Sequence, residues 1–192
     1  MLYYSLILNF APEMNVSRVI AFCLLMIIIG ACENKARQPE TRAEKPDAEK
    51  DKMIREQFVR VNRQVAQKES DEMDYYAKTH QMPFIKTPSG IRYFVYKPSV
   101  KGDSVKKDMQ ITMNFQVKLL DGTECYSSAT EGPKTFIVAH DDLESGIHRG
   151  VQYLKRGDKA VFLIPSVLAH GLLGDMNKIP PQMPIVYDVE IH

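Results

Sequence analysis

The strongest constraint on the fold is a stretch in which apolar and polar side chains alternate. Apolar residues occupy every second position there: Ile111, Met113, Phe115 and Val117. Successive side chains of a strand point to opposite faces of a sheet, so this stretch predicts a strand with one buried face. The dipeptide Asp121-Gly122 follows, and because both residue types tolerate a positive φ, it predicts a hairpin turn.

The rest of the C-terminal half has a similar character. Strands are predicted at residues 91–96, 135–138, 159–164 and 185–191. One short helix is predicted between them, because four apolar residues share a helical face: Leu143, Ile147, Val151 and Leu154. Gly157 suits the C-terminal cap of that helix. The expected fold class is therefore α+β, with an antiparallel sheet wrapped on one short helix.

Residues 53–82 predict an N-terminal helix ahead of the sheet. Its apolar side chains recur at helical spacing: Ile54, Phe58, Val61, Val65, Met73 and Tyr76. Pro83 and Pro88 end the pattern. We expect this apolar stripe to dock on the core of the domain or to extend a stalk, and the alternative is a dimerisation helix.

Residues 1–31 predict a signal peptide. The run from Val19 to Ala31 carries no charge and follows Arg18. A membrane-spanning helix needs about 20 apolar residues, so the run favours a secretory signal over a transmembrane span. Ile29-Gly30-Ala31-Cys32 resembles the lipobox of bacterial lipoproteins, which implies lipidation of the cysteine. The implied location is the bacterial cell envelope, as a lipid-anchored protein that faces the periplasm or belongs to the outer membrane. Met14 is an alternative start of translation.

Residues 32–52 are expected to form a charged, flexible tether. Between Glu33 and Lys52 acidic and basic residues alternate irregularly, and no apolar side chain larger than alanine occurs besides two prolines. Such a segment buries too little apolar surface to offset its conformational entropy. Over the whole chain, 25 Lys and Arg residues nearly balance 24 Asp and Glu residues, for a net charge of +1. This balance argues against nucleic acid as the main partner.

The sequence lacks the motifs of several enzyme classes. Its three cysteines are too few and too scattered for a disulfide framework or a cysteine-based zinc site. His140, His148 and His170 follow no metal-binding pattern, so each is expected to be exposed or satisfied within the core. No serine-nucleophile motif and no Gly-rich phosphate loop occurs. We therefore expect no metal and no cofactor, and chemistry that needs only an apolar pocket.

A series of short motifs runs from Thr87 to His192. In chain order they include Leu120-Asp121-Gly122, Tyr126-Ser127-Ser128, Gly157-Asp158-Lys159, Ile164-Pro165-Ser166, Ile179-Pro180-Pro181 and Tyr187-Asp188-Val189-Glu190. In order and spacing, residues 87–192 resemble the FK506-binding-protein (FKBP) type of peptidyl-prolyl cis-trans isomerase. Together with the lipobox and the single helix, the run from Leu168 to Asp175 resembles the gliding-motility-associated lipoproteins within that family.

The resemblance implies a rotamase that isomerises X-Pro bonds in envelope or secreted proteins and serves gliding motility or a secretion machinery. Its partners would be proline-containing polypeptide clients, and a membrane reached through the lipid anchor. Rotation about the amide has a barrier of about 18–20 kcal/mol, and a dry apolar cleft favours the less polar twisted state without a cofactor. The alternative is a membrane-anchored binding or chaperone module with weak catalysis.

The resemblance also implies the site residues. The catalytic positions are Phe115, Tyr126, His170 and Tyr187, and the substrate-binding positions are Cys125, Phe136, Leu143, Glu144, Ile147 and Ile179. His170 stands where the family offers a tyrosine hydroxyl to the bound carbonyl, and the backbone N–H of Glu144 is expected to bond a substrate carbonyl. Cys125-Tyr126 replaces an aromatic residue followed by Asp, and Ile147 replaces a tryptophan. These departures favour the binding module, whereas His170 and the retained Ile179-Pro180-Pro181 loop favour the isomerase. For Phe136 and Tyr187 the alternative role is ordinary core packing.

Overall fold

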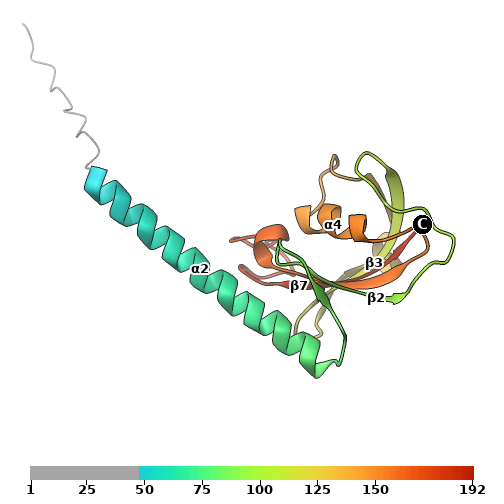
Figure 1. The fold of residues 1–192 in the computed structure, drawn as a ribbon, viewed down its shortest axis with the longest axis horizontal. Helices are drawn as coiled ribbons and strands as arrows, with labels where there is room; N and C mark the ends of the chain where they lie inside the picture. The colour runs from blue at the N-terminus through green and yellow to red at the C-terminus, as the bar shows by residue number, and fades with distance from the viewer. Residues whose placement is uncertain (1–47) are drawn as a thin grey trace, which may run out of the picture. The chain divides into compact units, whose positions relative to one another are not determined.

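The computed structural model describes residues 48–192 (Figure 1). The predicted signal peptide, the predicted lipidation site Cys32 and residues 32–47 of the predicted tether lie outside the described residues. The described part begins with one long helix, α2 (Ala48–Thr79), and continues into a sheet with short helices. Helical structure therefore includes the last residues of the segment expected to be a tether.

The strands of the described part form a single seven-stranded antiparallel sheet. In chain order they are β1 (Ile85–Lys86), β2 (Arg92–Lys97), β3 (Gln110–Leu119), β4 (Glu124–Ser127), β5 (Lys134–Ile137), β6 (Lys159–Ile164) and β7 (Ile185–Ile191). Their order across the sheet is β1-β2-β6-β7-β3-β4, and β5 also pairs with β3. The predicted strands are confirmed as β2, β3, β5, β6 and β7.

The alternating stretch forms β3, which pairs with β7 along one edge and with β4 and β5 along the other. Its four predicted apolar residues are at most 4% exposed, and the residues between them are half-buried. The predicted hairpin turn joins β3 to β4. Gly122 has a φ of +90°, and its N–H donates to the carbonyl of Leu119 at 3.0 Å.

The predicted short helix is α4 (Ser145–Gly150), which continues as the 3-10 turn η1 (Val151–Tyr153). Gly150 brings α4 close to the sheet, since a Cβ there would lie 2.9 Å from the Phe162 ring. The prediction that Gly157 caps this helix is wrong. Gly157 has a positive φ of +86°, but it lies in the turn before β6, where Asp158 accepts a hydrogen bond from the backbone N–H of Lys155.

The opposite face of the sheet is covered by the C-terminal half of α2. Alternate side chains of β6 point to opposite faces of the sheet. Ala160, Phe162 and Ile164 join the core on the α4 side. Val161 and Leu163 instead pack with Met73 of α2 and Val186 of β7. The apolar stripe of α2 thus docks through Met73 and the partly buried Tyr76, as one of the two expected arrangements predicts.

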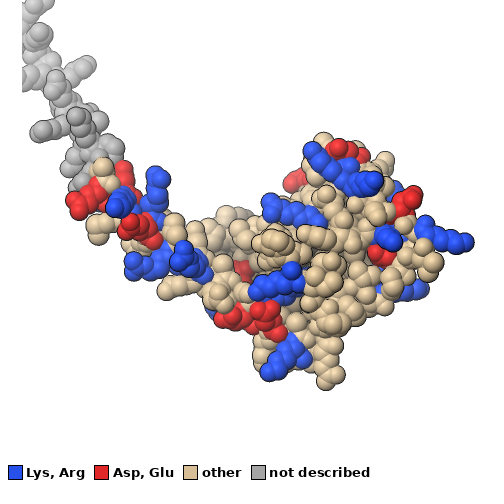
Figure 2. All heavy atoms as spheres, viewed as in Figure 1, with Lys and Arg blue, Asp and Glu red and all other residues tan. Residues whose placement is uncertain are grey.

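The N-terminal half of α2 has an exposed apolar stripe. Ile54 is 43% exposed, Phe58 64% and Val61 46%. Figure 2 shows Lys and Arg side chains and Asp and Glu side chains along the N-terminal half of the helix. No helix within residues 48–192 combines the length and the apolar character that crossing a bilayer requires.

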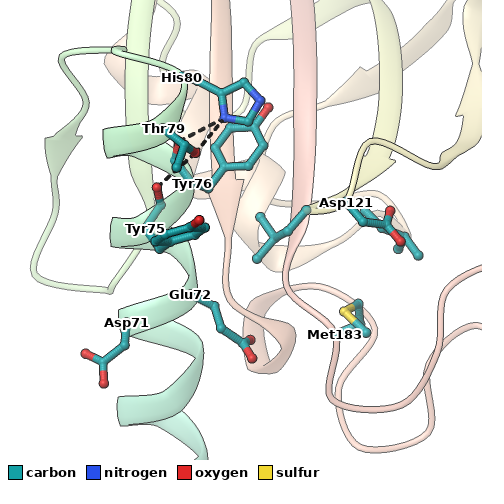
Figure 3. A pocket seen from close by; sticks show the side chains of 10 residues that line it. Asp71, Glu72, Tyr75, Tyr76, Thr79, His80, Asp121 and Met183 are labelled. Atoms are coloured by element: carbon teal, nitrogen blue, oxygen red, sulfur yellow. Dashed lines mark hydrogen bonds between the residues drawn. The ribbon is translucent and has the colours of Figure 1, made fainter.

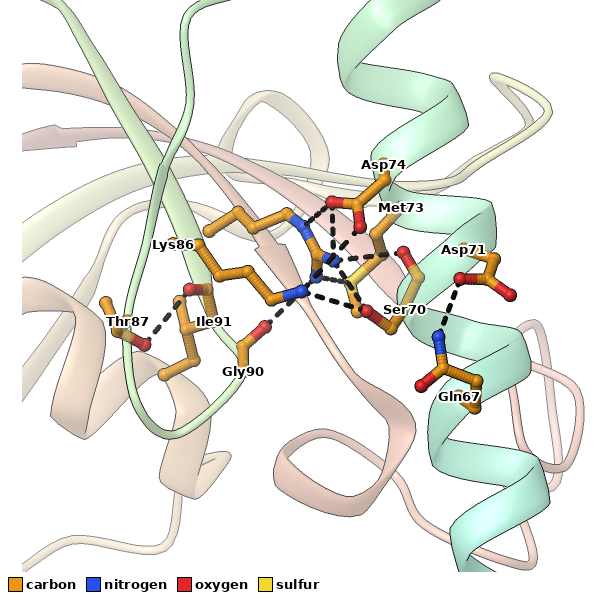
Figure 4. Close-up of polar contacts among 10 residues, drawn as sticks. Gln67, Ser70, Asp71, Met73, Asp74, Lys86, Thr87, Gly90 and Ile91 are labelled. Atoms are coloured by element: carbon orange, nitrogen blue, oxygen red, sulfur yellow. Dashed lines mark hydrogen bonds and ion pairs between the residues drawn. The ribbon is translucent and has the colours of Figure 1, made fainter.

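Polar contacts fix the register of α2 on the sheet edge (Figure 4). Arg92 of β2 is 2% exposed, and its Nε donates to Asp74 Oδ1 at 2.6 Å. Its Nη2 donates to the backbone carbonyl and the hydroxyl of Ser70, each at 2.9 Å. Lys86 of β1 also donates to the Ser70 hydroxyl at 3.1 Å. A buried guanidinium needs such partners, so this set selects one position of the helix. We call these contacts the Arg92 clamp.

Candidate active site

Three side chains from three elements meet at one carboxylate oxygen. Tyr187 lies on β7, Glu144 precedes α4, and His170 lies in the β6–β7 loop, residues 165–184. The Tyr187 hydroxyl donates to Glu144 Oε1 at 3.0 Å, and His170 Nε2 lies 3.1 Å from the same oxygen. The other oxygen, Oε2, is buried without a hydrogen-bond partner among the described residues. This arrangement offers an unused acceptor beside two polar donors.

The electrostatics of this cluster keep Tyr187 protonated. Burial raises the pKa of the Tyr187 phenol, and the negative charge of Glu144 and the hydrogen bond to it raise the pKa further. The side chain of Glu144 is only 11% exposed and that of His170 23% exposed. A protonated phenol therefore remains the donor to Glu144 across the physiological pH range.

A cavity of about 470 Å³ opens next to this cluster. It is lined by Lys134, Asp142, Leu143, Glu144, Ser145, Ala169 and His170. Leu143, Glu144 and His170 are predicted site residues, and the other four lining residues were not predicted. The lining is mainly polar, in contrast with the apolar cleft that the sequence led us to expect.

Lys134 could have been found from the sequence. In β5 its position differs by two from that of the buried Phe136, and a period of two places both side chains on the same face. Its Nζ lies 5.0 Å from the centroid of the Phe115 ring. Asp142 and Ser145 gave no comparable signal, because they flank a helix start whose position only the fold determines.

The remaining predicted residues belong to the hydrophobic core of the domain. The buried ones are Phe115, Cys125, Phe136, Ile147, Ile179 and Tyr187, and Tyr126 packs against them partly buried, as does Leu143 of the cavity lining. The rings of Phe115 and Tyr187 are tilted, with centroids 6.3 Å apart. Phe136 packs edge-on against His148, with centroids 5.5 Å apart. Of the ten predicted residues, three line the cavity (Leu143, Glu144 and His170), and the other seven lie in or against the core of the domain.

Tyr126 is tied to the β6–β7 loop by a carboxylate that the sequence analysis missed. Its hydroxyl donates to Asp175, whose other oxygen accepts the backbone N–H groups of Asn177 at 2.9 Å and Ile179 at 2.8 Å. Lys178 Nζ lies 4.9 Å from the centroid of the Tyr126 ring and donates to the carbonyl of Cys125 at 2.6 Å. A carboxylate is therefore present beside position 126, supplied by another segment. The positive φ of Gly174, +68°, is the local feature that turns the chain there.

His148 is satisfied within the core, as expected for a lone histidine. Its Nδ1 accepts the backbone N–H of Ala139 at 2.9 Å, and its Nε2 lies 2.9 Å from the carbonyl of Asp141. His140 is exposed beside Asp108. Within residues 48–192, no group of three or more His, Cys, Asp or Glu side chains has the geometry of a metal site.

A larger hollow, of about 750 Å³, lies between the end of α2 and the β3–β4 turn (Figure 3). Tyr75, Tyr76 and His80 line it from the helix, and Asp121 and Met183 line it from the opposite side. The rings of Tyr76 and His80 stack with centroids 3.8 Å apart. None of the predicted site residues lines this hollow.

Comparison with known proteins identifies the C-terminal part of the chain. Residues 101–192 match the family model of the FKBP-type peptidyl-prolyl cis-trans isomerases. These residues form an FKBP domain. The resemblance expected for residues 87–192 is therefore confirmed at the level of the family, and the fold of the FKBP domain is the predicted α+β sheet with one short helix.

Several relatives share the FKBP domain. A probable FKBP-type isomerase, FkpA, of Neisseria meningitidis is 39% identical over 106 residues, which are 55% of this chain and 38% of the relative. FkpA of Escherichia coli is 31% identical over 135 residues, 69% of this chain and 48% of the relative. A macrophage infectivity potentiator of Trypanosoma cruzi is 27% identical over 90% of this chain and 81% of its own length. The chain spans less than half the length of the two FkpA relatives.

Solved structures extend the likeness of fold beyond the FKBP domain. The crystal structure of Escherichia coli FkpA aligns with 94% of this chain and 82% of its own, with a TM-score of 0.56 and 24% identity. The crystal structure of AtFKBP13 aligns with 56% of this chain and 94% of its own, with a TM-score of 0.53 and 27% identity.

Proposed function

We propose that the FKBP domain catalyses cis-trans isomerisation of X-Pro bonds in polypeptides. The observation that carries this proposal is the cluster of Glu144, His170 and Tyr187 beside a cavity of about 470 Å³ within an FKBP domain. The relatives from Neisseria meningitidis and Escherichia coli bear the name of peptidyl-prolyl cis-trans isomerases. Their names supply the reaction class for this proposal.

The chemistry requires positioning and a low-polarity environment for the twisted amide. The amide loses conjugation as it rotates, so its carbonyl is less polar in the transition state than in the ground state. Of the residues that line the cavity, Leu143 and Ala169 are apolar and disfavour the polar planar form. Each tenfold acceleration requires about 1.4 kcal/mol, so a few thousandfold needs only about 5 kcal/mol.

Two hydrogen-bond donors are available to orient the substrate. His170 lines the cavity and can donate from its imidazole. Glu144 is the residue before the first turn of α4, and no hydrogen bond among the described residues uses its backbone N–H. In the proposed complex these groups bond the carbonyls that flank the proline.

A second candidate function is a binding or chaperone module of low catalytic activity. The polar lining of the cavity favours it, because Lys134, Asp142 and Glu144 stabilise a planar, polar amide as readily as a twisted one. Exposed apolar side chains in the β6–β7 loop also favour it, since Leu172 and Leu173 are each 67% exposed and Met176 is 83% exposed. Such side chains could contact unfolded clients.

We further propose a location and partners. The sequence around Cys32 supports a lipid-anchored envelope protein, and its clients would then be envelope or secreted polypeptides. The run from Leu168 to Asp175 supports a role in gliding motility or a secretion machinery. The exposed stripe on the N-terminal half of α2 supports pairing with a second copy of this helix.

The deciding experiment is a protease-coupled assay with chromogenic Xaa-Pro peptides in which Xaa is varied. We expect the full chain to accelerate isomerisation of at least one peptide above the uncatalysed rate. If it accelerates none, yet suppresses aggregation of an unfolded client, the binding module replaces the isomerase. If it does neither, both proposals are wrong.

A further inference from the structure

α2 reaches the loop that carries His170 through one buried carboxylate. Glu69 of α2 is 4% exposed, and Ser166 of the β6–β7 loop is 5% exposed. Glu69 Oε2 accepts the backbone N–H of Ser166 at 2.8 Å, and Oε1 accepts the Ser166 hydroxyl. The two residues are 97 positions apart in the chain. Both oxygens of the carboxylate are therefore used on a single residue of the loop.

The loop has a local need for this acceptor. Ser166 begins the 3-10 turn η2 (Ser166–Leu168), and the residue before it is Pro165, whose side chain makes no capping hydrogen bond. The first N–H groups of a helical turn have no acceptor within the turn. Glu69 supplies that acceptor from another element, and a buried N–H without one would be costly.

α2 and the β6–β7 loop also face each other across an open space. A cavity of about 460 Å³ lies between them, lined by Val65 and Ala66 of the helix and by Val167 and Leu172 of the loop. Glu69 and Ser166 line the same cavity. Among the described residues, the hydrogen bonds that join α2 to this loop are the two that Glu69 accepts from Ser166.

The link continues to the active site. The carbonyl of Ser166 accepts the backbone N–H of Ala169 at 2.9 Å and that of Gly171 at 2.7 Å. These two residues flank His170, whose Nε2 lies 3.1 Å from Glu144 Oε1. A shift of Ser166 would therefore move the backbone on both sides of His170.

We propose that Glu69 is a positioning residue for the isomerase site. It holds Ser166 in place, so that the segment from Ser166 to Gly171 keeps His170 on Glu144. The helix that precedes the FKBP domain is then part of its catalytic framework. The catalytic readout of this inference rests on the proposed isomerase function, whereas the structural readout does not.

The Arg92 clamp provides a matched control. Asp74 lies on the same helix and binds Arg92, but within residues 48–192 neither residue makes a hydrogen bond or an ion pair with Ser166, Ala169 or Gly171. Asp74→Ala therefore weakens the docking of α2 by the same kind of truncation without releasing the loop. Glu69→Gln keeps one carbonyl acceptor for Ser166 and is the conservative variant.

The test measures two quantities in the full chain. The first is kcat/KM with a chromogenic Xaa-Pro peptide, and the second is amide hydrogen exchange of Ala169 and Gly171 by NMR. For Glu69→Ala we expect kcat/KM to fall by about tenfold and both amides to exchange at least about tenfold faster. Glu69→Gln should stay within about threefold of the wild type, and Asp74→Ala within about twofold.

Two results would overturn the inference. One is an equal loss of kcat/KM in Glu69→Ala and Asp74→Ala, in proportion to their loss of stability. The other is unchanged exchange of both amides in Glu69→Ala. If the wild type itself shows no isomerase activity, the proposed function fails, and the exchange measurement still decides whether Glu69 holds the loop. If Glu69→Ala does not fold, Ser166→Ala is tested instead, because it removes only the hydroxyl donor. Ser166→Ala should accelerate amide exchange of Gly171 by about threefold. Unchanged exchange of Gly171 in this variant would contradict the inference.

Discussion

The Tyr187 hydroxyl donates to Glu144 Oε1 at 3.0 Å, which places a carboxylate against the buried face of β7. His170 approaches the same oxygen from the β6–β7 loop. The lining of the cavity beside them is mainly polar, and the three side chains form a hydrogen-bonded polar group at its edge. Two consequences for activity and stability can be measured by substitution.

Tyr187→Phe and Tyr187→Ala separate the hydroxyl from the ring. Tyr187→Phe keeps the ring and removes one donor to Glu144, so unfolding free energy should fall by about 0.5–1.5 kcal/mol. Tyr187→Ala also empties a position that is 1% exposed, so it should cost about 3 kcal/mol or more and reduce activity. Chemical denaturation of both variants gives the comparison. Equal losses in the two variants would mean that the ring contributes nothing beyond the hydroxyl.

His170→Ala tests the donor at the cavity. Removing one neutral hydrogen bond costs about 0.5–1.5 kcal/mol, so kcat/KM should fall by roughly threefold to tenfold without being abolished. His140→Ala is the matched control, because His140 is exposed and lies outside the cavity lining. Circular dichroism establishes that both variants are folded. A kcat/KM of His170→Ala equal to that of the control would remove His170 from the mechanism.

Asp175 predicts a specific acid sensitivity of the β6–β7 loop. Burial opposes ionisation of Asp175, but the hydrogen bonds from Tyr126 and from the backbone of Ile179 and Asn177 outweigh it, so its pKa is lowered. A lowered folded-state pKa contributes stability above the unfolded-state value near 4, and this stability is lost as pH falls through the folded-state pKa.

Thermal unfolding of the wild type and of Asp175→Asn between pH 7 and pH 2 measures this contribution. The wild type should be more stable at pH 7, and the difference should disappear at the acid end. Tyr126→Phe should reduce the difference because it removes one of the stabilising donors. A gap between the two proteins that is constant with pH would contradict the assignment.

The exposed stripe on α2 predicts a dimer. Replacing Phe58 and Val61 together by glutamate puts like charges on the paired faces, so the double variant should be monomeric by light scattering where the wild type is dimeric. Val167→Glu is the control, because Val167 is 76% exposed but lies in the β6–β7 loop. A wild type that stays monomeric at high concentration would rule out pairing through this helix.

The lipobox predicts lipidation of Cys32. Cys32→Ala should leave the precursor uncleaved by the lipoprotein peptidase and unlabelled by radioactive palmitate in bacterial cells. Cys23→Ala serves as the control and should keep both processing and label, because Cys23 lies within the predicted signal peptide. Label that persists in Cys32→Ala would disprove the prediction.

The strands and short helix could be predicted from the sequence because the signals that specify them are local. Alternation at Ile111, Met113, Phe115 and Val117 follows directly from the period of a strand, and β3 buries all four of these residues. The positive φ of Gly157 was also predictable, but the element it belongs to was not. A helical stripe does not show where an α-helix tightens into a 3-10 turn, as this one does at Val151.

The site residues were predicted through the family resemblance. The contacts among them are set only by the tertiary structure. Glu144 and Tyr187 are 43 residues apart, Tyr126 and Asp175 are 49 apart, and Glu69 and Ser166 are 97 apart. No periodicity in the sequence relates residues at such separations. Local sequence determines which face each side chain takes within its own helix or strand. Sheet pairing and loop closure then determine which faces meet, and burial makes a polar partner obligatory wherever a carboxylate is enclosed.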